Sequence, residues 1–167
     1  MKYGLIQNGP VVISTTLTLG LPIGNSSGGR TQLLQTGDGE FNQMITVEAS
    51  HSFYPKKLYT TGLLAFNNRT RGFSDEIRYG LEAGYHPGKW LLVLRLLGVK
   101  PLLNDNNEQL PVNGLFNNRV EYFSITPEIN YQLKERLGLS FSAAGAFYGK
   151  NILAAPTFSV GAYLKFD

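Results

Sequence analysis

The chain has 167 residues, of which 16% are charged, and it carries a formal net charge of +3 with no cysteine. This length has room for one domain, residues 1–167, and the charged fraction is low beside the roughly 25% of average soluble domains. The absence of cysteine excludes a disulfide framework and a thiolate metal site. The basic residues are scattered, so we expect no nucleic-acid partner.

Alternation of apolar and polar residues is the main pattern along the chain, and it begins near the N-terminus. In residues 77–86, for example, Ile77, Tyr79 and Leu81 alternate with Arg78 and Gly80, which is the period of a β-strand with two different faces. The phase of residues 58–66 stays open because two leucines are adjacent there. About nine strands and no helix are predicted, over residues 3–7, 11–23, 41–54, 58–66, 77–86, 90–99, 120–133, 137–148 and 157–166.

The connections between these predicted strands alternate between short and long. Short turns centre on Gly9, Lys56, Gly88 and Lys134, and long polar loops centre near Gly29, Arg71, Asn107 and Leu153. Soluble sandwiches have no reason to sort their loops in this way, whereas outer-membrane barrels pair short periplasmic turns with longer extracellular loops. The pattern predicts an all-β, antiparallel, up-and-down transmembrane β-barrel whose chain ends on the periplasmic side.

The last predicted strand, residues 157–166, resembles the C-terminal assembly signal of outer-membrane barrels. That signal places a polar residue, a glycine, an apolar residue and an aromatic residue at fixed spacing, and Ser159, Gly161, Leu164 and Phe166 occupy those places. The departure is Asp167, because such proteins usually end on the aromatic residue. The resemblance implies that the outer-membrane assembly machinery is a partner.

The start of the chain differs from that of an exported protein, which begins with a charged segment and an apolar stretch of about 7 to 15 residues. Here residues 1–8 already resemble the end of a strand. Either a signal has been removed or the chain is a piece of something longer. Since a closed barrel has an even number of strands, we expect an N-terminally incomplete barrel that lacks at least one strand before Tyr3.

Aromatic residues gather beside the connections of both kinds, as in the two interfacial girdles of a membrane barrel; a preference of aromatic residues for strand ends is the alternative. Those beside short turns are Phe53, Tyr54, Tyr59, Tyr85, Trp90 and Tyr131, and those beside long loops are Phe66, Phe116, Tyr122, Phe123, Phe147 and Tyr148.

Five charged residues are predicted to point into the lumen near the middle of their strands: Glu48, Arg78, Glu82, Arg95 and Glu128. Facing lipid, an arginine at the midplane would cost about 2 to 4 kcal/mol. Two interpretations remain open, a charged constriction that selects a polar solute and a structural ion-pair network that only occupies the lumen. No catalytic, cofactor-binding or metal site is predicted, and we expect no enzyme. Asp38 and Glu40 carry ligands suited to calcium, but a solvated loop is the simpler interpretation.

The tetrapeptide Phe-Asn-Asn-Arg occurs twice, at residues 66–69 and 116–119, each time beside a long loop. An aromatic interface residue followed by a polar exit from the membrane explains both copies. Contact of Arg69 and Arg119 with lipopolysaccharide phosphates is the alternative.

Several segments together resemble a family of bacterial outer-membrane barrels described as transporters of the meta-pathway of phenol degradation, distantly similar to long-chain fatty-acid channels. The resemblance covers only the C-terminal part of such a protein. It implies a place in the Gram-negative outer membrane, contact with membrane lipids and lipopolysaccharide, and porin-like transport of small solutes of apolar or aromatic character, with no cofactor. The segments are Lys2-Tyr3-Gly4-Leu5, Leu19-Gly20-Leu21-Pro22, Thr36-Gly37-Asp38-Gly39 and Ser159-Val160-Gly161.

Two other classes stay open on the sequence. A non-transporting anchor barrel with an occupied lumen accounts equally well for the inward charges. A soluble lipocalin-like β-barrel that binds a small ligand is the second, and it would be folded and monodisperse without detergent.

Overall fold

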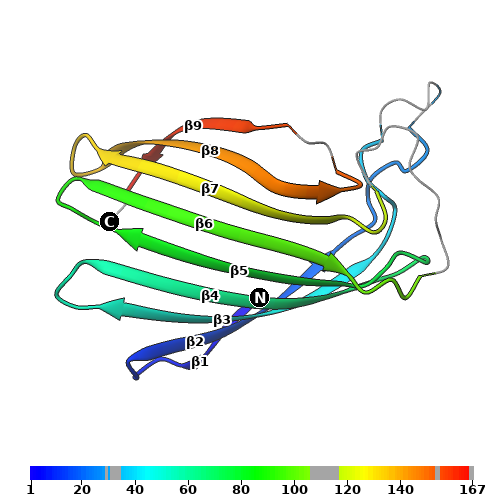
Figure 1. Cartoon of the computed structure of the whole chain (residues 1–167), viewed down its shortest axis with the longest axis horizontal. Helices are drawn as coiled ribbons and strands as arrows, with labels where there is room; N and C mark the ends of the chain where they lie inside the picture. Colours follow the sequence, from blue (N-terminus) through cyan, green and yellow to red (C-terminus); the bar gives the residue numbers. More distant parts are fainter. Residues whose placement is uncertain (29, 31–34, 106–116, 153–154, 166–167) are drawn as a thin grey trace.

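The computed structural model describes residues 1–28, 30, 35–105, 117–152 and 155–165. Within these ranges the chain forms one antiparallel sheet of nine strands, in which every strand pairs with the next one along the chain (Figure 1). No α-helix lies in the described ranges, so the predicted all-β, up-and-down architecture is confirmed. The strands are β1 (Lys2–Ile6), β2 (Val11–Gly20), β3 (Asn42–Phe53), β4 (Leu58–Arg69), β5 (Glu76–Tyr85), β6 (Trp90–Pro101), β7 (Glu121–Gln132), β8 (Leu137–Lys150) and β9 (Thr157–Leu164).

The sheet is open and does not close into a barrel within the described residues. Closure requires the two edge strands to pair, but β1 pairs with β2 and β9 pairs with β8, and the order of strands is linear. The edge strands are also the shortest, with 5 and 8 residues, while the strands between them have 10 to 14. Within the described residues the sheet is therefore a curved wall whose edge strands, β1 and β9, each pair with a single neighbour (Figure 1).

The short and long connections lie at opposite ends of this wall (Figure 1). The turns 54–57, 86–89 and 133–136 are at one end, and the ends of β2, β4, β6 and β8 that lead into the long connections are at the other. This sorting follows from the antiparallel order, because each strand reverses direction and so delivers every second connection to the same end.

The connection between β4 and β5 is shorter than its polar sequence predicts. Residues 67–76 were expected to form a loop, but β4 continues to Arg69 and β5 begins at Glu76. Asn67 pairs with Glu76 in the ladder, so the polar residues at these strand ends are part of the sheet. Only residues 70–75 connect the two strands.

The two faces of the sheet differ in composition and in exposure. On one side, which we call the apolar face, large side chains are open to the surroundings: Leu17 is 46% exposed, Phe141 47% and Val160 83%. Among the described residues the buried hydrophobic side chains are Ala65, Val93 and Val99. The register places all three on the opposite, polar face. The apolar face therefore has no core beneath it.

The sequence left open which residues of β4 point to which face of the sheet, because two leucines are adjacent. The pairing of β4 with β3 and β5 answers this. Leu64 pairs with Val47 and Tyr79 on the apolar face, where it is 60% exposed. Leu63 points to the polar face and pairs with Gly80. A Cβ at Gly80 would lie 2.7 Å from a methyl carbon of Leu97 and 3.3 Å from one of Leu63, so the glycine leaves room for two leucine side chains on the polar face.

Aromatic side chains form contacts at both ends of the apolar face. Trp90 packs on Tyr131 beside the short turns, with ring centroids 4.5 Å apart. Near the long connections, Phe123 stacks on Tyr79 and on Phe147. Two aromatic residues assigned to these groups from the sequence, Tyr59 and Tyr122, instead lie in the polar-face register, and Phe116 lies outside the described residues.

Candidate functional site

Three of the five predicted lumen charges form one connected cluster in the middle of the polar face, across β5, β6 and β7. Arg95 donates from Nε to Glu82 Oε2 at 2.6 Å and from Nη1 to Glu128 Oε2. The ladder brings them together, because Arg95 pairs directly with Glu82 and Glu128 pairs with the neighbouring Val93. We call Glu82, Arg95 and Glu128 the mid-sheet cluster.

Neighbouring side chains satisfy the remaining oxygens of the mid-sheet cluster. Tyr59 donates its hydroxyl to Glu82 Oε1 at 2.7 Å, and Asn130 donates from Nδ2 to Glu128 Oε1 at 2.8 Å. The Tyr59 ring reaches Glu82 by lying over Gly84, where an added Cβ would overlap it. The cluster is thus a network that spans four strands, from β4 to β7.

Glu48 lies on the same face, two strands away from this cluster. It accepts hydrogen bonds from Lys2 and Ser14, so it links β1 and β2 to β3. Lys2, Glu48, Glu82 and Arg95 all line one hollow of about 280 Å³. Glu48, Glu82 and Arg95 therefore share one space on the polar face.

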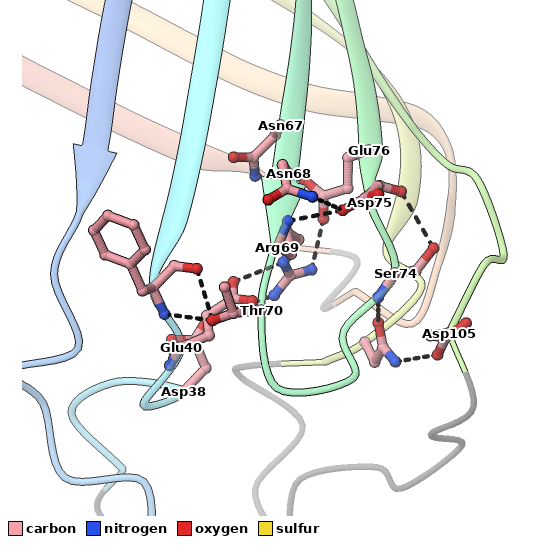
Figure 2. Close-up of polar contacts among 12 residues, drawn as sticks. Asp38, Glu40, Asn67, Asn68, Arg69, Thr70, Ser74, Asp75, Glu76 and Asp105 are labelled. Atoms are coloured by element: carbon pink, nitrogen blue, oxygen red, sulfur yellow. Dashed lines mark hydrogen bonds and ion pairs between the residues drawn. The ribbon is translucent and has the colours of Figure 1, made fainter.

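The fifth predicted residue, Arg78, belongs to a second group at the end of the sheet with the long connections. It donates to Glu76 Oε2 at 2.9 Å. Glu76 also accepts from Arg69 Nη1 at 2.7 Å, and Arg69 donates from Nε to Glu40 Oε1 at 2.6 Å (Figure 2). We call Asp38, Glu40, Arg69, Glu76 and Arg78 the loop-end cluster.

Arg69 is the centre of the loop-end cluster. Its side chain is only 7% exposed, and its guanidinium lies 3.5 Å from Asp38 and 4.6 Å from the centroid of the Phe73 ring. Three carboxylates and an aromatic ring thus surround one cation, because β4 delivers Arg69 to the point where the β2–β3 connection and the start of β5 meet (Figure 2). The buried Arg69 depends on these carboxylates, since a buried charge without a compensating partner is costly.

Glu40 has an unusual environment within this cluster. Its side chain is 1% exposed, and burial raises its pKa to about 7, against the opposing effect of Arg69. Its second oxygen, Oε2, is buried with no hydrogen-bond partner in the structure, and so is Oδ1 of Asn67. Both residues line a second hollow of about 210 Å³, the loop-end hollow, together with Arg69, Glu76 and Arg78.

The second copy of the Phe-Asn-Asn-Arg repeat ties the long connections together. Asn118 accepts from the backbone N–H of the fully buried Ser74 at 2.9 Å and donates to Asp105, to which Arg119 also donates at 3.0 Å. Burial alone would raise the pKa of Asp105, but the hydrogen bonds from Arg119 and its neighbours lower it. Both described arginines of the repeat therefore hold carboxylates of this chain, which gives no support to the alternative of lipopolysaccharide contact.

Sequence reasoning missed the loop-end cluster, although one signal for it was present. Arg69 and Glu76 were placed in a loop, and Asp38 and Glu40 were interpreted as part of a solvated loop, with calcium binding as the alternative. The repeated Asn-Asn-Arg motif was the available signal, since both copies lie beside connections and both turn out to bind carboxylates. The partner carboxylates are 29 and 14 positions away in the chain, which no local pattern reveals.

Other candidate groups do not converge in the part of the chain that the structure describes. His51 packs edge-on against Phe53 and contacts the carbonyl of Pro10, while Ser50 bonds Thr61 on the opposite face. No group of three or more His, Cys, Asp or Glu that could hold a metal ion occurs among the described residues. Nor do those residues include a helix long and apolar enough to span a membrane.

The proposed assembly signal lies on the edge strand β9. Ser159 and Gly161 pair with Ser142 and Ser140 on the polar face, while Leu164 is 60% exposed on the apolar face. Phe166 lies outside the described residues.

No protein-family model matches the chain, and no curated protein or solved structure has significant similarity to it. The resemblance to outer-membrane transporters therefore stays a prediction, and the functional argument is based on geometry.

Proposed function

We propose that this sheet is part of the wall of a bacterial outer-membrane β-barrel that passes small solutes along its polar face. The observation that carries the proposal is the reversed burial: the apolar side chains are exposed, and the ion pairs lie on the face that contains the few buried hydrophobic groups. Monomeric soluble proteins rarely expose a continuous apolar patch larger than about 300–600 Å². Lipid tails are the surroundings in which this face is stable.

Strand length supports the same proposal. A transmembrane β-strand needs about 9 to 11 residues when it is tilted by about 45°, and the strands from β2 to β8 have 10 to 14. The exposed aromatic side chains at both ends of the apolar face, among them Trp90 and Phe147, match the girdles at the two membrane interfaces.

In this proposal the edge strands β1 and β9 pair with further β-strands in the membrane. Hydrocarbon offers no hydrogen bonds to unpaired backbone groups, so membrane sheets close. Further strands, from the same protein or from another copy, would pair with β1 and β9 and complete the barrel. Membrane lipids and lipopolysaccharide would contact its outside, and the outer-membrane assembly machinery would insert it.

Lipid contact is tested with tryptophan. The chain has one, Trp90, which permits a Trp90→Phe background with a new tryptophan at Leu94 on the apolar face or at Thr126 on the polar face. Both positions lie at nearly the same height, since Arg95 pairs with Thr126 and Leu94 with Pro127. In vesicles of phosphatidylcholine brominated at mid-chain, strong quenching of the L94W variant and weak quenching of T126W are expected. Equal quenching of the two would remove the basis for the proposal.

A non-transporting anchor barrel is the second candidate, and the pairing of the charges within the mid-sheet cluster favours it. Liposome swelling with small sugars and aromatic acids separates the two functions, because an anchor passes nothing. Where single channels are observed, Arg78→Gln and Arg95→Gln should change conductance and ion preference if these side chains border the solute path. The lipocalin-like alternative needs apolar side chains to line the interior, and the exposed apolar face gives it no support.

A further inference from the structure

Basic residues that are scattered along the sequence come together at the end of the sheet with the short turns. The turns 54–57, 86–89 and 133–136 all lie at this end (Figure 1), and Glu135 is the one acidic residue in them. The lysines of these turns are all exposed. We call them the basic rim: Lys56, Lys57, Lys89 and Lys134.

Backbone hydrogen bonds join the three turns of the basic rim side by side. The N–H of His86 donates to the carbonyl of Lys57 at 3.0 Å, and the N–H of Gln132 donates to the carbonyl of Lys89 at 2.8 Å. The first turn is therefore held beside the second, and the second beside the strand that leads into the third. The lysines start from a continuous row of backbone positions and not from independent loops.

The lysines of the basic rim have no acidic partners. In the described part of the chain none of them takes part in an ion pair or a side-chain hydrogen bond. At the opposite end of the sheet Arg69 holds Glu40 and Glu76, and Lys150 lies 3.6 Å from Glu121. Like charges gathered in one place repel each other, so an anionic partner from outside the chain would stabilise the rim.

The neighbours of the basic rim indicate what kind of anion this partner carries. Trp90 follows Lys89 directly and packs on Tyr131, with ring centroids 4.5 Å apart. Phe53 and Tyr85 are exposed in the same row of the apolar face. Aromatic side chains of membrane proteins lie at the level of the lipid headgroups, so lysines in the adjoining turns would meet the lipid phosphates. An acidic soluble protein would not account for the exposed aromatic row.

We propose that the basic rim binds the headgroups of anionic phospholipids in the membrane leaflet at the short-turn end. The inference rests on the proposed function, which places the apolar face in lipid. Clusters of lysine next to a membrane span attract anionic lipids, and each lysine adds to the attraction. The sheet would therefore gather one class of lipid around this end.

Trp90 reports which lipid lies beside the rim. The wild-type chain is inserted into vesicles of equal parts phosphatidylcholine and phosphatidylglycerol, in which either one lipid or the other is brominated near its headgroup. Brominated phosphatidylglycerol should quench Trp90 as if it were enriched at least about fivefold, the effect of one lysine near an anionic surface. In about 1 M NaCl, where the Debye length is about 3 Å, the enrichment should fall below about twofold.

Variants assign the preference to the rim. The quadruple variant K56Q/K57Q/K89Q/K134Q should quench equally with either brominated lipid. Two double variants then remove the same charge from opposite ends of the sheet. K89Q/K134Q should lower the enrichment by about fivefold or more, and K100Q/K150Q should leave it within about twofold.

Three results would overturn the inference. Equal losses in the two double variants would mean that net charge, and not the rim, attracts the lipid. An unchanged preference in the quadruple variant would exclude the lysines. Displacement by inorganic phosphate, where sodium chloride of equal ionic strength has no effect, would identify a site for free phosphate and not for a headgroup.

The two proposals fail in different ways. If L94W is quenched by lipid brominated at mid-chain but Trp90 shows no preference for phosphatidylglycerol, the rim has no lipid specificity and the barrel proposal stands. If Trp90 shows the preference but L94W is not quenched, the rim adsorbs to the lipid surface while the apolar face stays outside it, which removes the barrel proposal instead.

Discussion

Arg69 and Arg95 each hold two glutamates, but their surroundings differ. Arg69 is 7% exposed, with carboxylates that are 1% and 4% exposed, whereas Arg95 and its partners are 21% to 36% exposed. Buried ion pairs carry a large desolvation cost, while exposed ones are weakened by solvent. The two clusters should therefore respond differently to pH and to substitution.

Glu40 should make stability fall as pH rises. The pKa of this carboxyl is about 7 in the folded chain, above its ordinary value of 4.5, because burial outweighs the attraction of Arg69. Between these two pH values the folded state binds more protons than the unfolded state, so the free energy of unfolding decreases with pH, by at most about 3 kcal/mol. Glu40→Gln should abolish this decrease and be the more stable protein at pH 8.

Urea unfolding in detergent at pH 4.5, 6 and 8 checks this prediction. The charged groups that face Glu40 are Asp38 from its own connection, Arg69 from β4, and Glu76 and Arg78 from β5. If the free energy of unfolding of the wild type instead rises with pH, and E40Q is the less stable protein at pH 8, then the Arg69 ion pair outweighs burial in its effect on the pKa of Glu40.

Arg95→Gln should destabilise the sheet by about 1 to 2 kcal/mol, because two glutamates on adjacent strands lose their shared charged donor. Arg95→Gln combined with Glu128→Gln should recover part of the loss, since the repulsion between Glu82 and Glu128 then disappears. Unfolding followed by the fluorescence of Trp90 measures both. If R95Q is as stable as wild type, the cluster behaves as an exposed surface pair.

Single residues were predictable from the sequence only where the strand period determines their direction. Glu82, Arg95 and Glu128 were placed on one face because alternate residues share a face, and the structure brings them together. Glu40 lies in the connection between β2 and β3, and Arg69 lies at the end of β4. Neither a connection nor a strand end has a repeating pattern from which the direction of a side chain could be predicted. This is why the more buried cluster escaped prediction.

At the scale of strands, three cross-strand pairs of tyrosine and glycine stabilise the sheet. Tyr59 faces Gly84 on the polar face, Tyr79 faces Gly98 on the apolar face, and Tyr163 faces Gly138 near the short turns. At each glycine the tyrosine ring occupies the space that a Cβ would need. The ring covers the glycine backbone and compensates for its missing side chain.

Gly84→Ala should therefore cost about 1 to 3 kcal/mol, the usual cost of overpacking, and should displace the Tyr59 hydroxyl from Glu82. In a Tyr59→Ala background the same substitution should cost less, because the ring is absent. A double-mutant cycle from urea unfolding gives the coupling, and Gly145→Ala, where an added Cβ has open space, is the matched control. Equal costs in both backgrounds would contradict the packing explanation.

The strands themselves were largely predictable, because nearly every one has a clear alternation between its two faces. Errors arose at ends where polar residues belong to the ladder, such as Asn67 and Glu76, and where apolar residues leave it, such as Leu21 beyond β2. The loss of β2 before Pro22 is consistent with the missing N–H of proline, which cannot donate to a ladder. The open sheet of nine strands is compatible with the incomplete barrel that we expected from the even number of strands in closed barrels.

At the scale of the whole molecule, the decisive property is the direction in which the apolar side chains point. A soluble sheet gains stability by burying one apolar face, yet Leu81 is 62% exposed at the middle of β5 and Leu94 is 42% exposed on β6. The ion pairs lie on the other side, at the same height. This arrangement is the basis of the proposal that hydrocarbon replaces water on the apolar face.

A charge placed at the middle of each face tests this directly. In water, Leu81→Arg at an exposed position should change stability by less than about 0.5 kcal/mol. In phosphatidylcholine vesicles it should cost about 2 to 4 kcal/mol, because arginine would lie at the lipid midplane. Ser142→Arg, on the polar face of β8 and paired with Glu128, should have little effect or stabilise the sheet. Folding titrations into vesicles compare the two, and equal free energies would place water, not lipid, on the apolar face.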